Sequence, residues 1–157
     1  MSDRSVFLFS FLTLVLVVAG AFSIPQFFVY ELVTSIIFLV IAVMVFFGED
    51  KFPYMLGIVA PILWLIFSFL TGEFVGDLSA VLRFLRGRPL GTFETPLPGF
   101  AILTGAALLI LSVRAWRKQV TEKFIGKTFT AALVVSLVWV ALLFWQFHQF
   151  STSVRPQ

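Results

Sequence analysis

Long apolar runs alternate with short polar connections along the chain. Five of these runs contain at most one charged residue each and cover residues 6–22, 27–47, 54–70, 97–113 and 129–147. A helix of about 20 apolar residues crosses the roughly 30 Å of hydrocarbon in a bilayer. The pattern therefore predicts an all-α fold, a polytopic bundle of about five transmembrane helices that forms a single integral membrane domain over residues 1–157.

The first two runs are separated by only four residues, 23–26, which include Pro25. So short a connection predicts an antiparallel helical hairpin. The first run also contains Ala19, Gly20 and Ala21, a pattern typical of signal-peptide cleavage sites. Because the run is longer than the apolar core of a signal peptide, about 7 to 15 residues, we expect it to remain as a span, with cleavage as the alternative.

The segment of residues 71–99, which follows the third run and overlaps the start of the fourth, is too charged to span a membrane. Its apolar side chains nevertheless repeat with helical spacing over residues 74–86. The predicted apolar face consists of Phe74, Leu78, Val81, Leu82 and Leu85. We expect a short amphipathic helix, flat on the membrane surface or across the bundle, with Asp77 and Arg83 away from its apolar face.

The basic residues beside the apolar runs predict the orientation of the chain. The sequence contains 11 Lys and Arg and 8 Asp and Glu, for a formal net charge of +3. With five spans, seven basic residues fall on the side of the N-terminus, in the N-terminal segment and in the loops 48–53 and 114–127. Lys and Arg are enriched in cytoplasmic loops, so we expect a cytoplasmic N-terminus and an external C-terminus. We expect the plasma (inner) membrane because no organelle-targeting segment is recognisable in the sequence. Because these residues flank the spans, we expect no nucleic-acid partner.

The composition excludes several classes of chemistry. Cys is absent and His148 is the only histidine, so neither a disulfide framework nor a thiolate metal site exists. The sequence also contains no Gly-rich phosphate loop, nucleophile elbow or zinc-protease motif. Apolar residues make up 60% of the chain and charged residues 12%, against about 45–50% and 25% in soluble proteins. The sequence favours a non-catalytic membrane protein.

Two groups of charged residues are candidates for a binding site. Glu31 is the only acidic residue in an apolar run, and such carboxylates typically handle protons or cations. Its place near the start of the run also suits a polar anchor at the membrane surface. Arg83, Arg86 and Arg88 form a basic cluster at the end of the amphipathic segment. The cluster suits anionic lipid headgroups or an acidic partner, with a solvated polar face as the alternative.

His148 follows the last apolar run and lies close to Trp145 in the sequence. One imidazole is sufficient as an axial ligand for haem or a chlorophyll-type pigment, whereas a protein metal site normally needs three or four ligands. A structural role at the membrane surface is the alternative. No cofactor is predicted from the residues alone.

Three functional hypotheses follow from these patterns. The first is a non-catalytic accessory or assembly subunit, which packs its Phe-rich helices against lipid and the other subunits of a larger membrane complex. The second is a small transporter, channel or lipid-binding protein, whose site combines Glu31, a helix kink at Pro61 and the three arginines. The third is a haem- or pigment-bearing subunit that uses His148.

Extraction from native membranes in mild detergent tests these hypotheses together. We expect an accessory subunit to co-migrate with other proteins in a large particle during sizing. A pigment-bearing subunit shows a visible absorbance band in the same run. A colourless particle that contains this protein alone contradicts both and favours the transporter, channel or lipid-binding class.

Overall fold

The computed structural model describes residues 2–23, 25–48, 51–91, 94–120 and 126–153. Within these ranges the chain forms six α-helices and one short 3-10 helix, without strands. The elements are α1 (Ser2–Ser23), η1 (Pro25–Phe27), α2 (Phe28–Phe46), α3 (Phe52–Thr71), α4 (Glu73–Leu85), α5 (Leu97–Gln119) and α6 (Gly126–Ser153). All of the α-helices except α4 are long and apolar enough to cross a membrane. The predicted fold class is confirmed: the chain is an all-α integral membrane protein.

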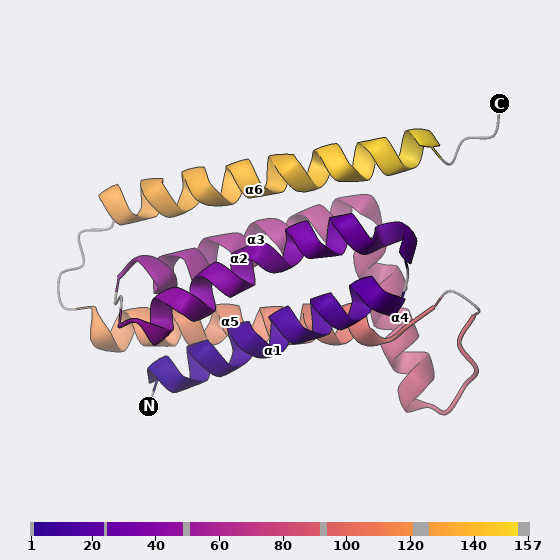
Figure 1. Ribbon diagram of the computed structural model, residues 1–157. Coiled ribbons are helices and arrows are strands. Elements are labelled where there is room, and N and C mark those ends of the chain that lie inside the picture. Colours follow the sequence, from indigo (N-terminus) through magenta and orange to yellow (C-terminus); the bar gives the residue numbers. More distant parts are fainter. Residues whose placement is uncertain (1, 24, 49–50, 92–93, 121–125, 154–157) are drawn as a thin grey trace.

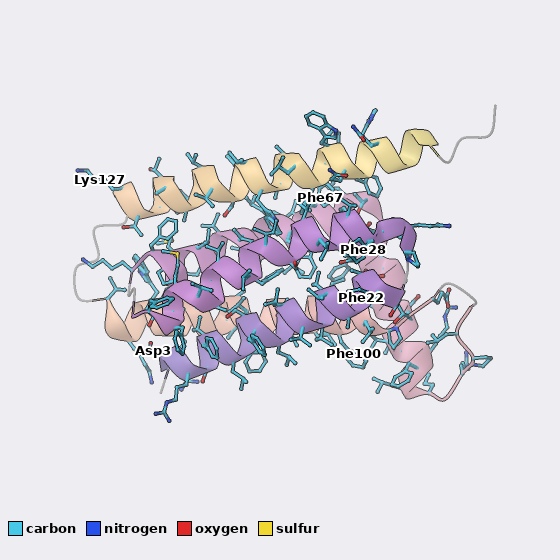
Figure 2. The ribbon with its side chains drawn as sticks, in the orientation of Figure 1. Asp3, Phe22, Phe28, Phe67, Phe100 and Lys127 are labelled. Carbon is cyan, nitrogen blue, oxygen red and sulfur yellow. The ribbon has the colours of Figure 1, made fainter. Side chains whose placement is uncertain are left out.

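The five long helices run along a common direction, and α4 crosses one end of the bundle at an angle (Figure 1). α1 packs against α2 and α5, and α3 packs against α5 and α6. α1 begins at the end of the bundle opposite to the one where α6 ends (Figure 1). Asp3 and Lys127 lie at the end where α1 begins, and Phe22, Phe28 and Phe100 lie toward the α4 end (Figure 2).

Aromatic side chains hold the centre of the bundle together. The ring of Phe38 on α2 makes edge contacts with Trp64 on α3 and Trp139 on α6, at centroid distances of 5.3 and 6.2 Å. The indole nitrogen of Trp139 donates a hydrogen bond to the carbonyl oxygen of Val33, at 2.8 Å. Because this bond forms in an apolar environment, it fixes how α6 sits against α2.

Two glycines position α4 at the end of the bundle. Gly72 separates α3 from α4 and has a φ of +82°, a left-handed conformation that side chains disfavour. Gly99 lies near the start of α5, where an added Cβ would meet the carbonyl oxygen of Asp77 at 2.4 Å. The backbones of α4 and α5 therefore touch directly, and this contact brings the first half of α4 against the bundle.

The face that α4 turns toward the bundle overlaps the predicted apolar face only in part. Val81 is buried, and Phe74 and Leu78 pack against the core of the bundle. Leu82 and Leu85, the other two residues of the predicted face, are 52% and 67% exposed. Ala80 is buried, and Asp77, expected to point away, lines a cavity inside the bundle. The predicted orientation of Asp77 is wrong, because the side of α4 that meets the bundle is set by its close approach to Gly99, which requires small residues, whereas lipid accepts exposed leucines as readily as a protein core does.

Gly99→Ala tests the contact between α4 and α5. We expect a loss of about 1 to 3 kcal/mol in the free energy of unfolding, because the new methyl group overlaps backbone atoms that cannot rotate away. Gly76→Ala on α4 is the matched control, since nothing lies within 4 Å of its added Cβ. The control is expected to be neutral or to stabilise by up to about 1 kcal/mol. Unfolding in detergent measures both, and equal effects would contradict the proposed contact.

Candidate functional site

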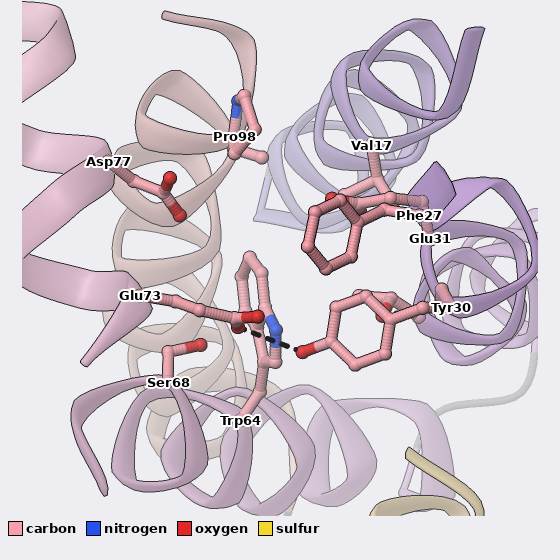
Figure 3. Close-up of a pocket in the computed structure, with 11 residues that line it drawn as sticks. Val17, Phe27, Tyr30, Glu31, Trp64, Ser68, Glu73, Asp77 and Pro98 are labelled. Carbon is pink, nitrogen blue, oxygen red and sulfur yellow. Dashed lines mark hydrogen bonds between the residues drawn. The ribbon is translucent and has the colours of Figure 1, made fainter. Parts of the chain in front are cut away.

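A cavity of about 130 Å³ lies where α4 meets the bundle (Figure 3). Each of the helices α1 to α5 and the short η1 contributes to its wall. The lining residues are Val17, Phe27, Tyr30, Glu31, Thr34, Trp64, Ser68, Glu73, Asp77, Pro98 and Ala101. Several helix termini lie here, because α2, α4 and α5 begin at this end of the bundle and α1, α3 and α6 end there.

Three carboxylates face this cavity. Glu31 lies in the first turn of α2, and Glu73 and Asp77 lie four residues apart at the start of α4. No Lys, Arg or His is among the described residues that line it. Partly buried carboxylates without a cationic neighbour are unfavourable when ionised. The cavity therefore favours either protonation of its carboxylates or the binding of a positively charged ligand.

A hydrogen bond connects two sides of the cavity. The hydroxyl of Tyr30 on α2 donates to Glu73 Oε2 on α4, at 3.0 Å (Figure 3). The ring of Tyr30 lies against Phe27 and Phe147, with both centroid distances at 6.4 Å. Through Phe147 the outer helix α6 therefore contacts a residue that forms part of the site.

The surroundings of α4 change the proton affinity of its two carboxyl groups. Burial raises the pKa of Asp77 to about 7, and the negative charge of nearby Glu73 adds to this effect. Burial also raises the pKa of Glu73, although hydrogen bonds from Tyr30 and Thr71 act in the opposite direction. Asp77 thus exchanges its proton near neutral pH, the range in which proton-coupled groups operate.

The cavity wall also contains hydrogen-bonding groups that have no partner among the described residues. The side chains of Trp64 and Ser68 are only 5% and 2% exposed, and both line the cavity. No described residue bonds to Trp64 Nε1 or Ser68 Oγ. The hydroxyl of Thr34, by contrast, donates to the carbonyl oxygen of Tyr30 at 2.9 Å. Trp64 and Ser68 are therefore the uncharged polar groups of the wall with free bonding capacity.

The structure brings only one part of the sequence-predicted transport site to the cavity. Glu31 lines it, whereas Pro61 is buried within α3 and is not among the lining residues. Arg83 forms an exposed ion pair with Glu94 at 2.9 Å. Arg86 and Arg88 follow the end of α4 and are exposed. Their contact with lipid or a partner stays a prediction.

His148 lies elsewhere, on the outer helix α6. Its side chain is exposed, and its ring centroid is 6.4 Å from that of Phe144. It is not among the residues that line the cavity. The haem or pigment hypothesis is therefore independent of the cavity and stays a prediction.

Glu73 and Asp77 are the site residues that sequence reasoning did not identify. Glu73 was accounted for only as a charge that keeps residues 71–99 out of the membrane, and Asp77 also as a residue away from the apolar face of the amphipathic helix. Their four-residue spacing places them on one face of a helix, and they directly follow the end of a span. Glu31 lies near the start of the preceding span, so an antiparallel arrangement of the two spans puts all three residues at one end of the bundle. The spacing of Glu73 and Asp77, together with the antiparallel spans, could therefore have predicted an acidic site at this end of the bundle.

The three carboxylates surround a space rather than a single point. Among the described residues, no group of three His, Asp or Glu side chains is arranged to hold a metal ion. Comparisons with protein-family models, with curated proteins and with solved structures find no match. The function is therefore argued from the geometry and charge of the cavity.

The raised pKa of Asp77 predicts how the stability of the folded protein depends on pH. An unfolded aspartate has a pKa near 3.9, so between about pH 4 and 7 the folded state binds more protons than the unfolded state. Stability must then fall as pH rises through this range and level off above it. We expect Asp77→Asn to raise the thermal midpoint at pH 8 by about 2 to 4 °C, or roughly 1 kcal/mol in a chain of this size, with no gain at pH 4.

Glu94→Gln is the matched control, because Glu94 is exposed and ion-paired rather than part of the cavity. It should not show the same gain at pH 8. Thermal unfolding between pH 4 and 8 measures all three proteins. An Asp77→Asn curve that stays parallel to the unmodified curve at every pH would show that Asp77 does not titrate as described.

Proposed function

We propose that this integral membrane protein is a small transporter that binds a cationic solute or protons in the cavity formed by Glu31, Glu73 and Asp77. The observation that carries the proposal is the concentration of three carboxylates on a cavity whose described lining residues include no cationic side chain. Ionisable residues inside membrane proteins typically mark ion or substrate pathways, because their burial otherwise destabilises the fold. A catalytic function has no comparable support.

Charge neutrality is the physical basis of the proposal. Each carboxylate of the cavity lowers its free energy either by taking up a proton or by contacting a cation. A solute that carries positive charge therefore competes with protons for the same oxygen atoms. This competition is the simplest way to couple the movement of a cation to a pH gradient.

The position of the cavity supports access from one side of the membrane. Its lining residues place it at the end of the bundle, beside the first turns of α2 and α4. Beyond it, the inward face of α5 continues through Thr104, which is partly buried, and then through Leu108 and Ser112, which are buried. Thr104 and Ser112 are separated by about 12 Å along the helix, and Leu108 between them is fully buried. In this conformation the apolar interior separates the cavity from the far end of the bundle, as alternating access requires.

Flux measurements in proteoliposomes test the proposal. The vesicles carry a pH gradient and are exposed in turn to Na⁺, K⁺, Mg²⁺, methylammonium and guanidinium, while internal pH and solute uptake are recorded. We expect flux of protons or of at least one cation, and a reduction of at least tenfold in Glu31→Gln, because the cavity then loses one of its charges. Glu94→Gln, outside the cavity, is the control and is expected to retain full flux.

Equal amounts of correctly inserted protein are required for the comparison, so flux is normalised to protein recovered from the vesicles. The absence of any flux in the unmodified protein contradicts transport. Equal flux in Glu31→Gln and the unmodified protein removes Glu31 from the site.

The accessory-subunit hypothesis is a second proposal, supported by the position of α6. Among the described helices, α6 packs only against α2 and α3. Its outward side exposes large apolar residues, namely Val134, Val138, Leu142, Phe144 and Trp145. Lipid covers such a surface, and so does another membrane subunit. Sizing after mild extraction distinguishes a surface covered by lipid from one covered by another subunit, because only the latter gives a large particle that contains other proteins.

A further inference from the structure

The walls of the cavity combine negative charge with aromatic rings. Phe27, Tyr30 and Trp64 contribute rings (Figure 3). The face of an aromatic ring attracts a cation, most strongly when the cation has lost part of its water shell. A cavity lined by both carboxylates and rings suits an organic cation, which has apolar surface as well as charge, better than a strongly hydrated metal ion.

The spacing of the carboxylates leads to the same ligand class. A bare metal ion gathers several oxygen ligands within about 2.0 to 2.6 Å of one point, and no group of three such side chains among the described residues is arranged in that way. A polyatomic cation distributes its N–H groups in several directions and reaches carboxylates on different sides. Glu31 on α2 and the Glu73 and Asp77 pair on α4 are placed for such a ligand.

The volume of the cavity limits the size of the ligand. The centre of one water molecule needs about 10 to 15 Å³ of such space, so a cavity of about 130 Å³ has room for several water molecules or for a cation of a few non-hydrogen atoms. Guanidinium and short primary ammonium ions fall within this limit. The unpartnered hydroxyl of Ser68, which is 2% exposed and lines the cavity, is available to accept an N–H bond from either ion.

We propose that the cavity binds a compact organic cation with several N–H groups, a guanidinium or a primary ammonium ion, in exchange for a proton held by Glu31, Glu73 or Asp77. This inference rests on the transport function proposed above and adds the solute class and the coupling. In the exchange, one carboxylic acid releases its proton to water and the resulting carboxylate pairs with one cation, so charge is conserved.

The titratable groups around the cavity are few. α2 contributes Tyr30 and Glu31, and α4 contributes Glu73 and Asp77. The lining residues from η1 and from α1, α3 and α5 do not titrate. Burial raises the pKa of both α4 carboxyl groups, that of Asp77 to about 7. Near neutral pH these carboxyl groups therefore still hold protons that a bound cation can displace.

Proton release on binding tests the exchange with the purified full-length chain in mild detergent. Guanidinium chloride at millimolar concentration is added at pH 6.5 in weak buffer, and a pH indicator and calorimetry follow the reaction. Methylammonium is the second probe. We expect saturable binding of both and release of about one proton per cation. Tetramethylammonium carries the same charge without N–H groups and is expected to bind at least tenfold more weakly.

Two variants connect the binding to the cavity. Asp77→Asn and Glu31→Gln are each expected to weaken guanidinium binding at least tenfold and to reduce proton release, whereas Glu94→Gln leaves both unchanged. Asp77→Asn removes a charge that destabilises the folded state at neutral pH, so its loss of binding is not a consequence of unfolding.

The alternative outcomes separate this inference from the function on which it rests. Binding of Na⁺, K⁺ or Mg²⁺ alone, with Glu31-dependent flux of that ion, overturns the organic-cation inference and leaves the transport proposal intact. Binding of guanidinium without proton release overturns the exchange. The absence of binding by every probe, together with the absence of flux in vesicles, overturns both.

Discussion

The hydrocarbon core of a bilayer offers no hydrogen-bond partners, so each polar group on a spanning helix depends on the protein itself. Many hydroxyls of this chain find a partner locally. Those of Ser10, Thr13 and Thr34 donate to the carbonyl oxygen four residues earlier in the same helix. Ser112 and Ser136 are buried without a partner among the described residues, but a lone hydroxyl is far less unfavourable than a lone charge. The carboxylates of the cavity are the groups for which local bonding cannot compensate.

The fold tolerates three partly buried carboxylates because the cavity lies at the end of the bundle. Glu31 sits one turn inside α2, and Glu73 and Asp77 belong to a helix that does not span the membrane. At this depth, water reaches a carboxylate more readily than at the midplane of the bilayer. Gly99 then allows α4 to lie against α5 so closely that its carboxylates enclose a space. The same charges at the centre of the bundle would destabilise the fold much more.

The architecture follows largely from the sequence, whereas the site does so only in part. Apolar runs and their charged boundaries identify the long helices, because the thickness of a bilayer sets a minimum length for each span. Glu31 is conspicuous for the same reason, as a charge within such a run. Asp77 was assigned to the wrong side of α4, because the hydrophobic pattern cannot tell a face that meets lipid from a face that meets protein. Only the approach of two backbones at Gly99, a contact between distant parts of the chain, decides that orientation.

Tyr30 connects the cavity to the outermost helix of the bundle. Its hydroxyl depends on Glu73 as acceptor, and its ring rests against Phe147 near the end of α6. A guest that pairs with Glu73 competes for that acceptor, and any new position of the Tyr30 ring alters its contact with Phe147. Under the proposed function, a change at Glu73 would thereby reach the last turns of α6, where Phe144 and Trp145 are exposed. A neighbouring molecule bound along this surface would sense the occupied state without touching the solute.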